Sequence, residues 1–238
     1  MNKLILEAHE FFKNCDFSYY ICGGFALEMF VGKTMRKHSD LDVSLFHENK
    51  RDVVALLQND GWNMYKRIPE PGTMGCATPI ADHMDSKLDE IRTMWAIKPG
   101  SHITLNLREG ETDIYDFDIL RDNQTDFNFI EIVLDSKKGD NFVLREDINI
   151  VRQLDKAILY NNGIPYMSPE LVMFLKSPQV YTTHDFHKEK TPADFKTIIP
   201  LLPDESRQWL INALNTAYPD GYGWISYFGG EMICTHKI

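Results

Sequence analysis

The stretch GGFALEMFVGKTMRKHSDLDVSLF, residues 23–46, decides the fold that we expect. The residues before it, SYYIC at 18–22, are rich in β-forming side chains and predict a strand that ends at the two glycines. Residues 25–31 then fit a short helix. The first turn of a helix has unpaired N–H groups and a partial positive charge, and glycine lets a ligand approach the backbone. Gly23 and Gly24 are therefore candidate phosphate-binding residues, although an ordinary strand–helix turn fits a lone glycine pair as well.

Two aspartates, Asp40 and Asp42, begin the next predicted strand. Residues i and i+2 of a strand project from the same face, with Cα atoms about 6.5–7 Å apart. Both carboxylates can therefore reach one hard cation while Leu41 turns toward the core. Magnesium favours sites in which one or two carboxylates share the ion with water and substrate phosphates. The sequence predicts a Mg²⁺ site at this pair, because the pair follows the glycine turn by one helix.

A third carboxylate usually completes a phosphoryl-transfer site, and the strand predicted over 113–120 offers one. Asp116 and Asp118 share one face of this strand, whereas apolar residues occupy the other face. An acidic face on such a strand is costly to bury unless a cation meets it. A functional strand and an exposed edge strand explain the pattern equally well.

Residues 23–46 resemble the signature of the antibiotic nucleotidyltransferases of the polymerase-β-like superfamily. Aminoglycoside 2″-adenylyltransferase-like and lincosamide nucleotidyltransferase-like proteins look nearest. The places of the family pattern are filled here by Gly23, Gly24, Phe25, Ala26, Leu27, Glu28, Gly32, Thr34, Arg36, His38, Asp40 and Asp42. Phenylalanine stands for the more usual tryptophan, and glutamate for the more usual aspartate. The likeness is good again over about 114–215 and is lacking over 60–112.

The resemblance implies roles for the acidic residues. Asp40, Asp42 and Asp118 are implied as the catalytic and metal-binding carboxylates, with Mg²⁺ as the cofactor. Asp118 completes the metal shell or acts as general base, since an acceptor hydroxyl with a pKa of about 15 needs help to lose its proton. Asp116 takes this place if the strand register differs by two residues.

The resemblance also implies a nucleotide-binding set that consists of Gly23, Gly24, Arg36, His38 and Lys176. In this interpretation Arg36 contacts phosphate, His38 orients an aspartate or touches substrate, and Lys176 reaches the triphosphate from the C-terminal half. The alternative is structural. Arg36 then forms a salt bridge with an aspartate, His38 caps the strand and Lys176 faces solvent.

The expected fold class is α+β, with a polymerase-β-like mixed sheet flanked by helices and a smaller, mainly helical C-terminal region. We expect a nucleotidyltransferase domain over 1–148 and a mainly helical domain over 149–238, because helix-start signals become clear after about residue 147. The sequence further predicts helices over 2–15 and 49–59 and strands over 91–97, 102–107 and 127–134. Residues 68–90 look loop-like.

Composition narrows the classes of partner. The 238 residues include 25 Lys and Arg against 35 Asp and Glu, a net charge of −10, which disfavours duplex DNA or long RNA. No apolar run is long enough to cross a bilayer, and the first residues lack the apolar core of a signal peptide, so we expect no membrane partner. The four cysteines include no CxxC pair and fit a reduced, cytoplasmic interior.

The predicted function is Mg²⁺-dependent transfer of a nucleoside monophosphate, AMP from ATP, to a hydroxyl of a small molecule. The resemblance implies an aminoglycoside or lincosamide antibiotic as the acceptor. One alternative is a toxin-type nucleotidyltransferase that modifies protein or tRNA, although the acidic surface disfavours tRNA. Another is a catalytically silent nucleotide-binding module, against which the three expected acids argue.

Overall fold

The protein is described by a computed structural model of residues 1–238, except for residues 71–74, 146, 178–189 and 220–238. The helices of the described part are α1 (Lys3–Phe12), α2 (Gly23–Val31), α3 (Lys50–Asn59), α4 (Leu154–Ala157), α5 (Pro169–Lys176), α7 (Lys190–Ile198) and α8 (Asp204–Ala217), with 3-10 turns η1 (His47–Asn49), η2 (Ser86–Leu88) and η4 (Ile199–Leu201). The strands are β1 (Tyr19–Ile21), β2 (Asp42–Phe46), β3 (Asn63–Ile68), β4 (Cys76–Pro79), β5 (Thr93–Ile97), β6 (Ile103–Leu107), β7 (Tyr115–Ile119), β8 (Phe129–Lys138), β9 (Asn141–Val143), β10 (Val151–Gln153), β11 (Ile158–Asn161) and β12 (Ile164–Met167).

The described strands form one mixed sheet in the order β11-β12-β1-β2-β8-β5-β3-β4-β7-β6, to which β9 is attached through β8 and β10 through β9. β1 runs parallel to β12, and β2 runs parallel to β8. The other paired strands are antiparallel. The expected α+β class with a mixed sheet is therefore confirmed.

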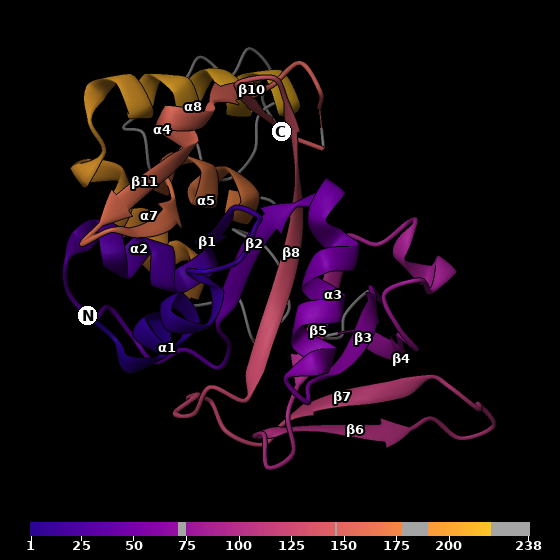
Figure 1. The fold of residues 1–238 in the computed structure, drawn as a ribbon. Coiled ribbons are helices and arrows are strands. Elements are labelled where there is room, and N and C mark those ends of the chain that lie inside the picture. The colour runs from indigo at the N-terminus through magenta and orange to yellow at the C-terminus, as the bar shows by residue number, and fades with distance from the viewer. Residues whose placement is uncertain (71–74, 146, 178–189, 220–238) are drawn as a thin grey trace.

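The helices cover the sheet in two groups (Figure 1). α3 lies over β3 and β5, while α2, α5, α7 and α8 gather around the end of the sheet that contains β1 and β12. α5 contacts α2, α7 and α8, so it lies at the centre of the second group. This group brings helices from the C-terminal half against α2, the helix that begins with the diglycine.

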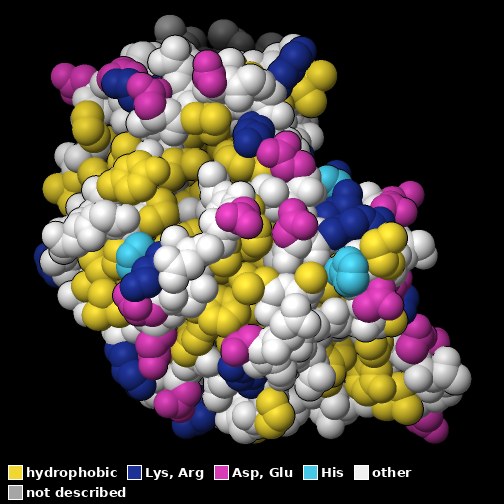
Figure 2. All heavy atoms as spheres, viewed as in Figure 1, with side chains coloured by type: hydrophobic (Ala, Val, Ile, Leu, Met, Phe, Trp, Pro, Cys, Tyr) yellow, Lys and Arg dark blue, Asp and Glu magenta, His cyan; other side chains and the backbone are white. Residues whose placement is uncertain are grey.

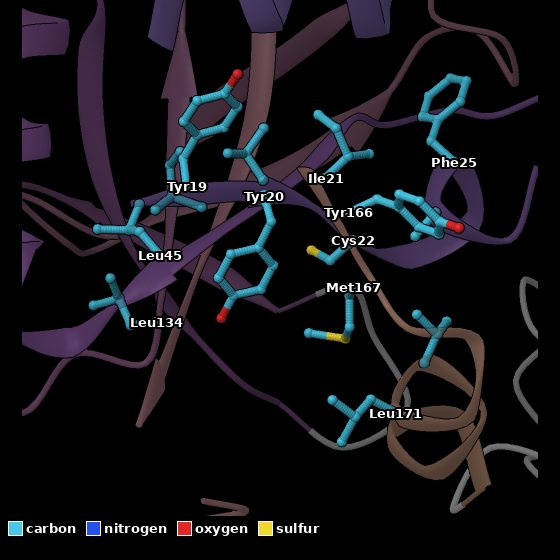
Figure 3. Packing of buried hydrophobic residues seen from close by; sticks show 14 of the residues in the cluster. Tyr19, Tyr20, Ile21, Cys22, Phe25, Leu45, Leu134, Tyr166, Met167 and Leu171 are labelled. Carbon is cyan, nitrogen blue, oxygen red and sulfur yellow. The ribbon is translucent and has the colours of Figure 1, made fainter. Parts of the chain in front are cut away.

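Strands from both sides of the predicted boundary at 148/149 pair with one another. β12 adds to β1 with Ile21 opposite Tyr166, and β10 pairs with β9. Figure 3 shows Tyr166 and Met167 of β12 near Cys22, with Leu171 of α5 beyond them. These side chains belong to one large hydrophobic core that also contains the buried faces of α1 and α3. The sheet thus continues across the boundary, and the division into two domains stays a prediction.

Several short strands were not expected from the sequence. β3 and β4 lie in the segment without a recognised resemblance, and β4 lies inside the stretch that looked like a loop. β10, β11 and β12 precede α5, α7 and α8 of the C-terminal half, although helices still make up most of its described residues. Strands of three or four residues are shorter than the period-2 pattern needs to stand out. The helix after β1 begins at Gly23 rather than Phe25, with Cys22 as its N-cap.

Acidic and basic side chains are interspersed over the face shown in Figure 2, so the net charge does not form one acidic surface there. Within the described ranges, no helix combines the length and the apolar character that crossing a membrane requires. Cys15, Cys22 and Cys76 are free thiols, and Cys234 lies outside the described residues.

Candidate active site

Three carboxylates meet at the junction of β2 and β8. Oxygens of Asp40, Asp42 and Glu131 all lie within 4.8 Å of one another. The parallel pairing of β2 and β8 sets Asp42 opposite Glu131, and the Glu131 N–H donates to the Leu41 carbonyl at 3.0 Å. Two adjacent strands therefore contribute one acid each to the cluster. Asp40, which lies two residues before Asp42 and so outside β2, contributes the third.

The cluster is electrostatically unfavourable without a cation. Burial raises the pKa of Asp42 well above its usual range, and the negative charges of Asp40 and Glu131 raise it further. Burial also raises the pKa of Glu131, against the opposing effect of Arg67, whose Nη1 lies 3.3 Å from Glu131 Oε1. Three half-buried carboxylates that repel one another, all hard oxygen donors, fit a divalent cation of the Mg²⁺ type.

Glycine is needed at positions 23 and 24 because neighbouring side chains leave no room for a Cβ atom there. A Cβ on Gly23 would lie 1.8 Å from Asp42 Oδ2, and Gly23 has a φ of +61°, which disfavours other residues. A Cβ on Gly24 would lie 2.4 Å from the imidazole of His38 and 2.9 Å from Arg36 Nη2. The start of α2 therefore lies directly against the aspartate and against the loop that precedes it. Phosphate binding by the two glycines stays a prediction.

Glu28 of α2 organises the loop between α2 and β2. Its Oε1 accepts hydrogen bonds from the N–H groups of Met35 at 2.7 Å and Arg36 at 3.2 Å, and from His38 Nε2 at 2.9 Å. Because Nε2 donates to Glu28, His38 Nδ1 is left to accept from Arg36 Nη1 at 3.1 Å. Burial, assisted by the Arg36 guanidinium, lowers the pKa of His38, which agrees with a neutral ring. Phe25 lies against this ring at 4.2 Å between centroids.

A cavity of about 440 Å³ connects these groups with the C-terminal half. The carboxylate cluster and the diglycine line this cavity, as do Met167 and side chains of α5 and α7. Four cationic side chains also line it, namely Arg36, Arg67, Lys176 and Lys190. Arg67 is paired with Glu131 of the cluster. Carboxylates and cations that share one cavity can hold a metal ion and an anionic ligand next to each other.

The structure brings seven of the eight predicted site residues to this cavity, namely Gly23, Gly24, Arg36, His38, Asp40, Asp42 and Lys176. Arg36 Nη2 lies 3.5 Å from Asp194, which is the aspartate ion pair that the structural interpretation expected, and Arg36 also lines the cavity. The solvent-facing alternative for Lys176 is wrong, because its side chain is only 16 % exposed and lies 3.2 Å from Asp194.

The expected place of Asp118 beside Asp40 and Asp42 is wrong. Asp118 lies on β7, which four strands separate from β2, and it accepts a hydrogen bond from Asn106 at 3.1 Å. The fallback residue Asp116 lies on the same distant strand, where it pairs with Arg108. The acidic face of this strand is exposed, but β7 pairs with both β4 and β6 and is the second strand from the edge, so it is not the edge strand that the alternative expected.

Sequence reasoning missed Glu131, although the strand that carries it was predicted. The signal was available, since FIEIVL places a single carboxylate in an otherwise apolar strand, where a charge needs a partner. Arg67, which pairs with Glu131, had no signal of comparable strength, and Glu28 was a place of the family pattern to which no role was given. Their roles depend on pairings that only the folded chain defines.

Residues 4–74 match the family model described as aminoglycoside-2''-adenylyltransferase. This segment contains the diglycine, Glu28, His38 and both aspartates of the cluster. The resemblance to antibiotic nucleotidyltransferases is therefore confirmed for this part of the chain. No curated protein matches the sequence.

Among solved structures, the chain is similar to the lincosamide antibiotic adenylyltransferase LnuA in its lincomycin-bound form, with a TM-score of 0.48 and 13 % identity over 82 % of this chain and 96 % of that chain. It is also similar to ANT(2")-Ia in complex with adenylyl-2"-tobramycin, with a TM-score of 0.45 and 11 % identity over 88 % of this chain and 92 % of that chain. Both scores lie below 0.5 and both identities below 25 %, so these similarities assign no activity to the chain.

Proposed function

We propose that this chain is a Mg²⁺-dependent nucleotidyltransferase that transfers a nucleoside monophosphate, AMP from ATP, to a hydroxyl group of a small acceptor. The acceptor we propose is an antibiotic of the aminoglycoside or lincosamide class, in line with the family match of residues 4–74. We also propose a cytoplasmic location, because ATP is the proposed donor and because Cys15, Cys22 and Cys76 are free thiols.

One observation carries this proposal. The three clustered carboxylates of Asp40, Asp42 and Glu131 share a cavity of about 440 Å³ with the start of α2 and with Arg36, Lys176 and Lys190, besides the Arg67 that pairs with Glu131. A triphosphate needs cations along its length and a divalent ion at the reacting phosphate. The three cations meet the first need, and the carboxylate cluster could hold the ion.

Asp40 and Asp42 are the proposed metal ligands, with Glu131 close enough to share the ion. When bound there, Mg²⁺ supplies charge neutralisation at the phosphate oxygens. Asp42 is held in place by its neighbours, since its carbonyl accepts the Cys22 N–H at 3.0 Å and its carboxylate lies against Gly23. A ligand fixed by the backbone on both sides loses little freedom when it binds.

Glu131 takes the role that the sequence had given to Asp118. In the proposed reaction the acceptor hydroxyl oxygen forms a bond to the α-phosphorus, the bond to pyrophosphate breaks, and the hydroxyl proton passes to the Glu131 carboxylate. A carboxylate whose pKa is raised by burial accepts a proton more readily than an exposed one. Arg67, at 3.3 Å, orients this carboxylate.

Arg36, Lys176 and Lys190 are proposed to bind the triphosphate. Arg36 is positioned by Glu28 through His38, so its guanidinium is oriented before the nucleotide arrives. Lys176 ends α5 and Lys190 begins α7, so both come from the C-terminal half. The nucleotide therefore binds between elements that are far apart in the sequence.

The test is pyrophosphate release by the purified chain with ATP, Mg²⁺ and a panel of aminoglycosides and lincosamides, with mass spectrometry of the acceptor. We expect release with at least one acceptor and an adenylyl group on the product. Glu131→Gln should lower kcat by about 100-fold or more, the range typical of a lost general base. Asp118→Asn is the matched control and should stay within about twofold of the unmodified chain, since fewer than 0.5 kcal/mol are at stake far from the reaction.

Two results would contradict the proposal in different ways. If Asp118→Asn loses activity while Glu131→Gln keeps it, the third carboxylate is misassigned. If no acceptor is modified and ATP binding is independent of Mg²⁺, the chain is a silent nucleotide-binding module. Adenylylated proteins or tRNA in expressing cells would instead identify a macromolecular acceptor.

A further inference from the structure

A single buried carboxylate lies among the cations of the proposed nucleotide site. Asp194 of α7 is 2 % exposed, and its Oδ2 lies 3.2 Å from Lys176 Nζ and 3.5 Å from Arg36 Nη2. The mechanism proposed above gives this residue no role.

The contacts of Asp194 are ionic rather than directional. Among the described residues, Oδ2 has no partner in hydrogen-bonding geometry, although it is buried and both cations are close. A carboxylate that is held in place by good hydrogen bonds is costly to separate from its partners, whereas one held by charge alone exchanges them more easily. Asp194 therefore neutralises the two cations without orienting them, and Arg36 is oriented instead by His38 and the Lys37 carbonyl.

Both cations that Asp194 neutralises, Arg36 and Lys176, line the cavity. Arg36 comes from the loop after α2, Lys176 from α5, and both line the cavity together with Lys190. Burial and the proximity of Arg36 lower the pKa of Lys190, which agrees with an excess of positive charge around these three cations. Without an anion the three cations repel one another. Asp194 supplies one negative charge there, whereas a triphosphate would supply several.

We propose that Asp194 is an internal counter-ion of the nucleotide site: it neutralises Arg36 and Lys176 in the empty cavity and yields them to the triphosphate. The inference rests on the proposed function. It makes Asp194 a positioning residue that does not touch the reacting atoms. Its consequence is that Asp194 weakens nucleotide binding and speeds the release of pyrophosphate, because it competes with phosphate for the same two cations.

The counter-ion role and a merely structural role predict opposite signs. A buried carboxylate that only holds α7 in place would, when neutralised, loosen the site and weaken nucleotide binding. A competing counter-ion would, when neutralised, leave its cations free for phosphate and strengthen binding. The sign of the change in affinity therefore separates the two roles.

The experiment is calorimetric titration of the full chain with Mg²⁺ and α,β-methylene-ATP, which cannot release pyrophosphate. We expect Asp194→Asn to bind the analogue about five- to tenfold more tightly than the unmodified chain, within the usual range of coupling between neighbouring groups. Steady-state turnover with ATP should fall while a single turnover is unaffected, because product release slows. Asp204→Asn, which removes an exposed acid at the start of α8, is the matched control and should leave the affinity unchanged.

A second variant keeps the test available if Asp194→Asn does not fold. The pair Lys176→Gln/Asp194→Asn leaves one cation fewer to be neutralised, and it should bind the analogue at least as tightly as Lys176→Gln alone. Weaker binding by this pair, or by a folded Asp194→Asn, overturns the counter-ion role. Failure of the unmodified chain to bind the analogue overturns the proposed function as well, whereas binding without any gain in Asp194→Asn overturns this inference alone.

Discussion

The chain contains two strands that present a pair of aspartates two residues apart, and the fold gives them opposite surroundings. Asp40 and Asp42 lie at a strand near the middle of the sheet, half-buried with Glu131, in mutual repulsion. Asp116 and Asp118 lie on β7 near the far edge, exposed and engaged with Arg108 and Asn106. Figure 1 shows how far β7 lies from β1 and β2.

The difference teaches that spacing alone does not make an acid pair a metal site. Asp116 and Asp118 share one face of β7, as a period of two requires, whereas Asp42 begins β2 and Asp40 lies two residues before it. Within the described part of the chain, the first pair alone has a third acid on the adjacent strand and a cavity that it lines. Acids that repel one another in a half-buried position need a cation, whereas acids with cationic or amide partners in solvent do not.

The sharpest test of this comparison is to neutralise one aspartate of each pair. Asp42→Asn should lower nucleotidyl transfer by about 10²–10³-fold, since several kcal/mol of metal-dependent stabilisation are lost. Without metal it should raise the melting temperature by a few degrees, because about 1 kcal/mol corresponds to roughly 2–4 °C in a chain of this size. Pyrophosphate release and thermal unfolding with and without Mg²⁺ measure both effects.

Asp116→Asn is the matched variant on the outer strand. It removes one partner of Arg108 and should lower the melting temperature slightly while activity stays unchanged. A stabilising effect of Mg²⁺ that survives in Asp42→Asn and disappears in Asp116→Asn would reverse the comparison.

A second test addresses the contact between α2 and Asp42. Gly23→Ala places a methyl group 1.8 Å from the present position of Asp42 Oδ2, so it should displace the carboxylate and lower activity by at least about tenfold, the effect that a misplaced ligand produces. The matched variant is Gly32→Ala, because Gly32 has a similar positive φ of +77° but a Cβ added there would meet no atom within 4 Å. It should cost only about 1 kcal/mol of stability from the backbone. Equal activities of the two variants would show that the contact with Asp42 is unimportant.

A smaller effect is expected at Glu28, which supports the site without lining the metal cluster. Glu28→Ala removes the acceptor of three hydrogen bonds and should lower the free energy of unfolding by about 2–3 kcal/mol. The KM for ATP should rise as Arg36 loses its orientation. Glu28→Gln retains an oxygen acceptor and should recover most of both losses, as denaturant titration and initial rates can establish. No recovery in Glu28→Gln would indicate that the charge, rather than the hydrogen bonding, is what matters.

The smallest effect is expected on the outer strands. Arg108→Gln breaks exposed ion pairs with Glu70 and Asp116 and should change the free energy of unfolding by no more than about 1 kcal/mol. Activity should remain unchanged in the pyrophosphate assay. A large loss of activity would mean that β6 and β7 contribute to the site after all.

The sequence predicted the local parts of the site and missed the parts that depend on strand pairing. Gly23, Gly24 and the first aspartate pair follow one another within 20 residues, so propensity and spacing were enough to bring them together. Glu131 comes nearly 90 residues after Asp42, and no local pattern states that β8 is the neighbour of β2. The same limit explains Asp118, whose strand face was predicted correctly but whose place in the sheet order was not.

Fold prediction had a similar limit. Longer elements such as α1 and α3 have a strong apolar period and were predicted close to their observed ranges. The strands over 151–167 have three or four residues each, and their stability comes from pairing with β1 and β9 rather than from their own composition.

The pairing of β12 with β1 has a consequence for any attempt to study the halves separately. A fragment that stops at residue 148 would lack β12 and leave the backbone of β1 unpaired on one side, close to Cys22 and the diglycine. An exposed strand edge of this kind can pair with strands of other chains and promote aggregation. The N-terminal half is thus completed by a strand from the C-terminal half, and truncation would disturb the end of the sheet that carries the candidate site.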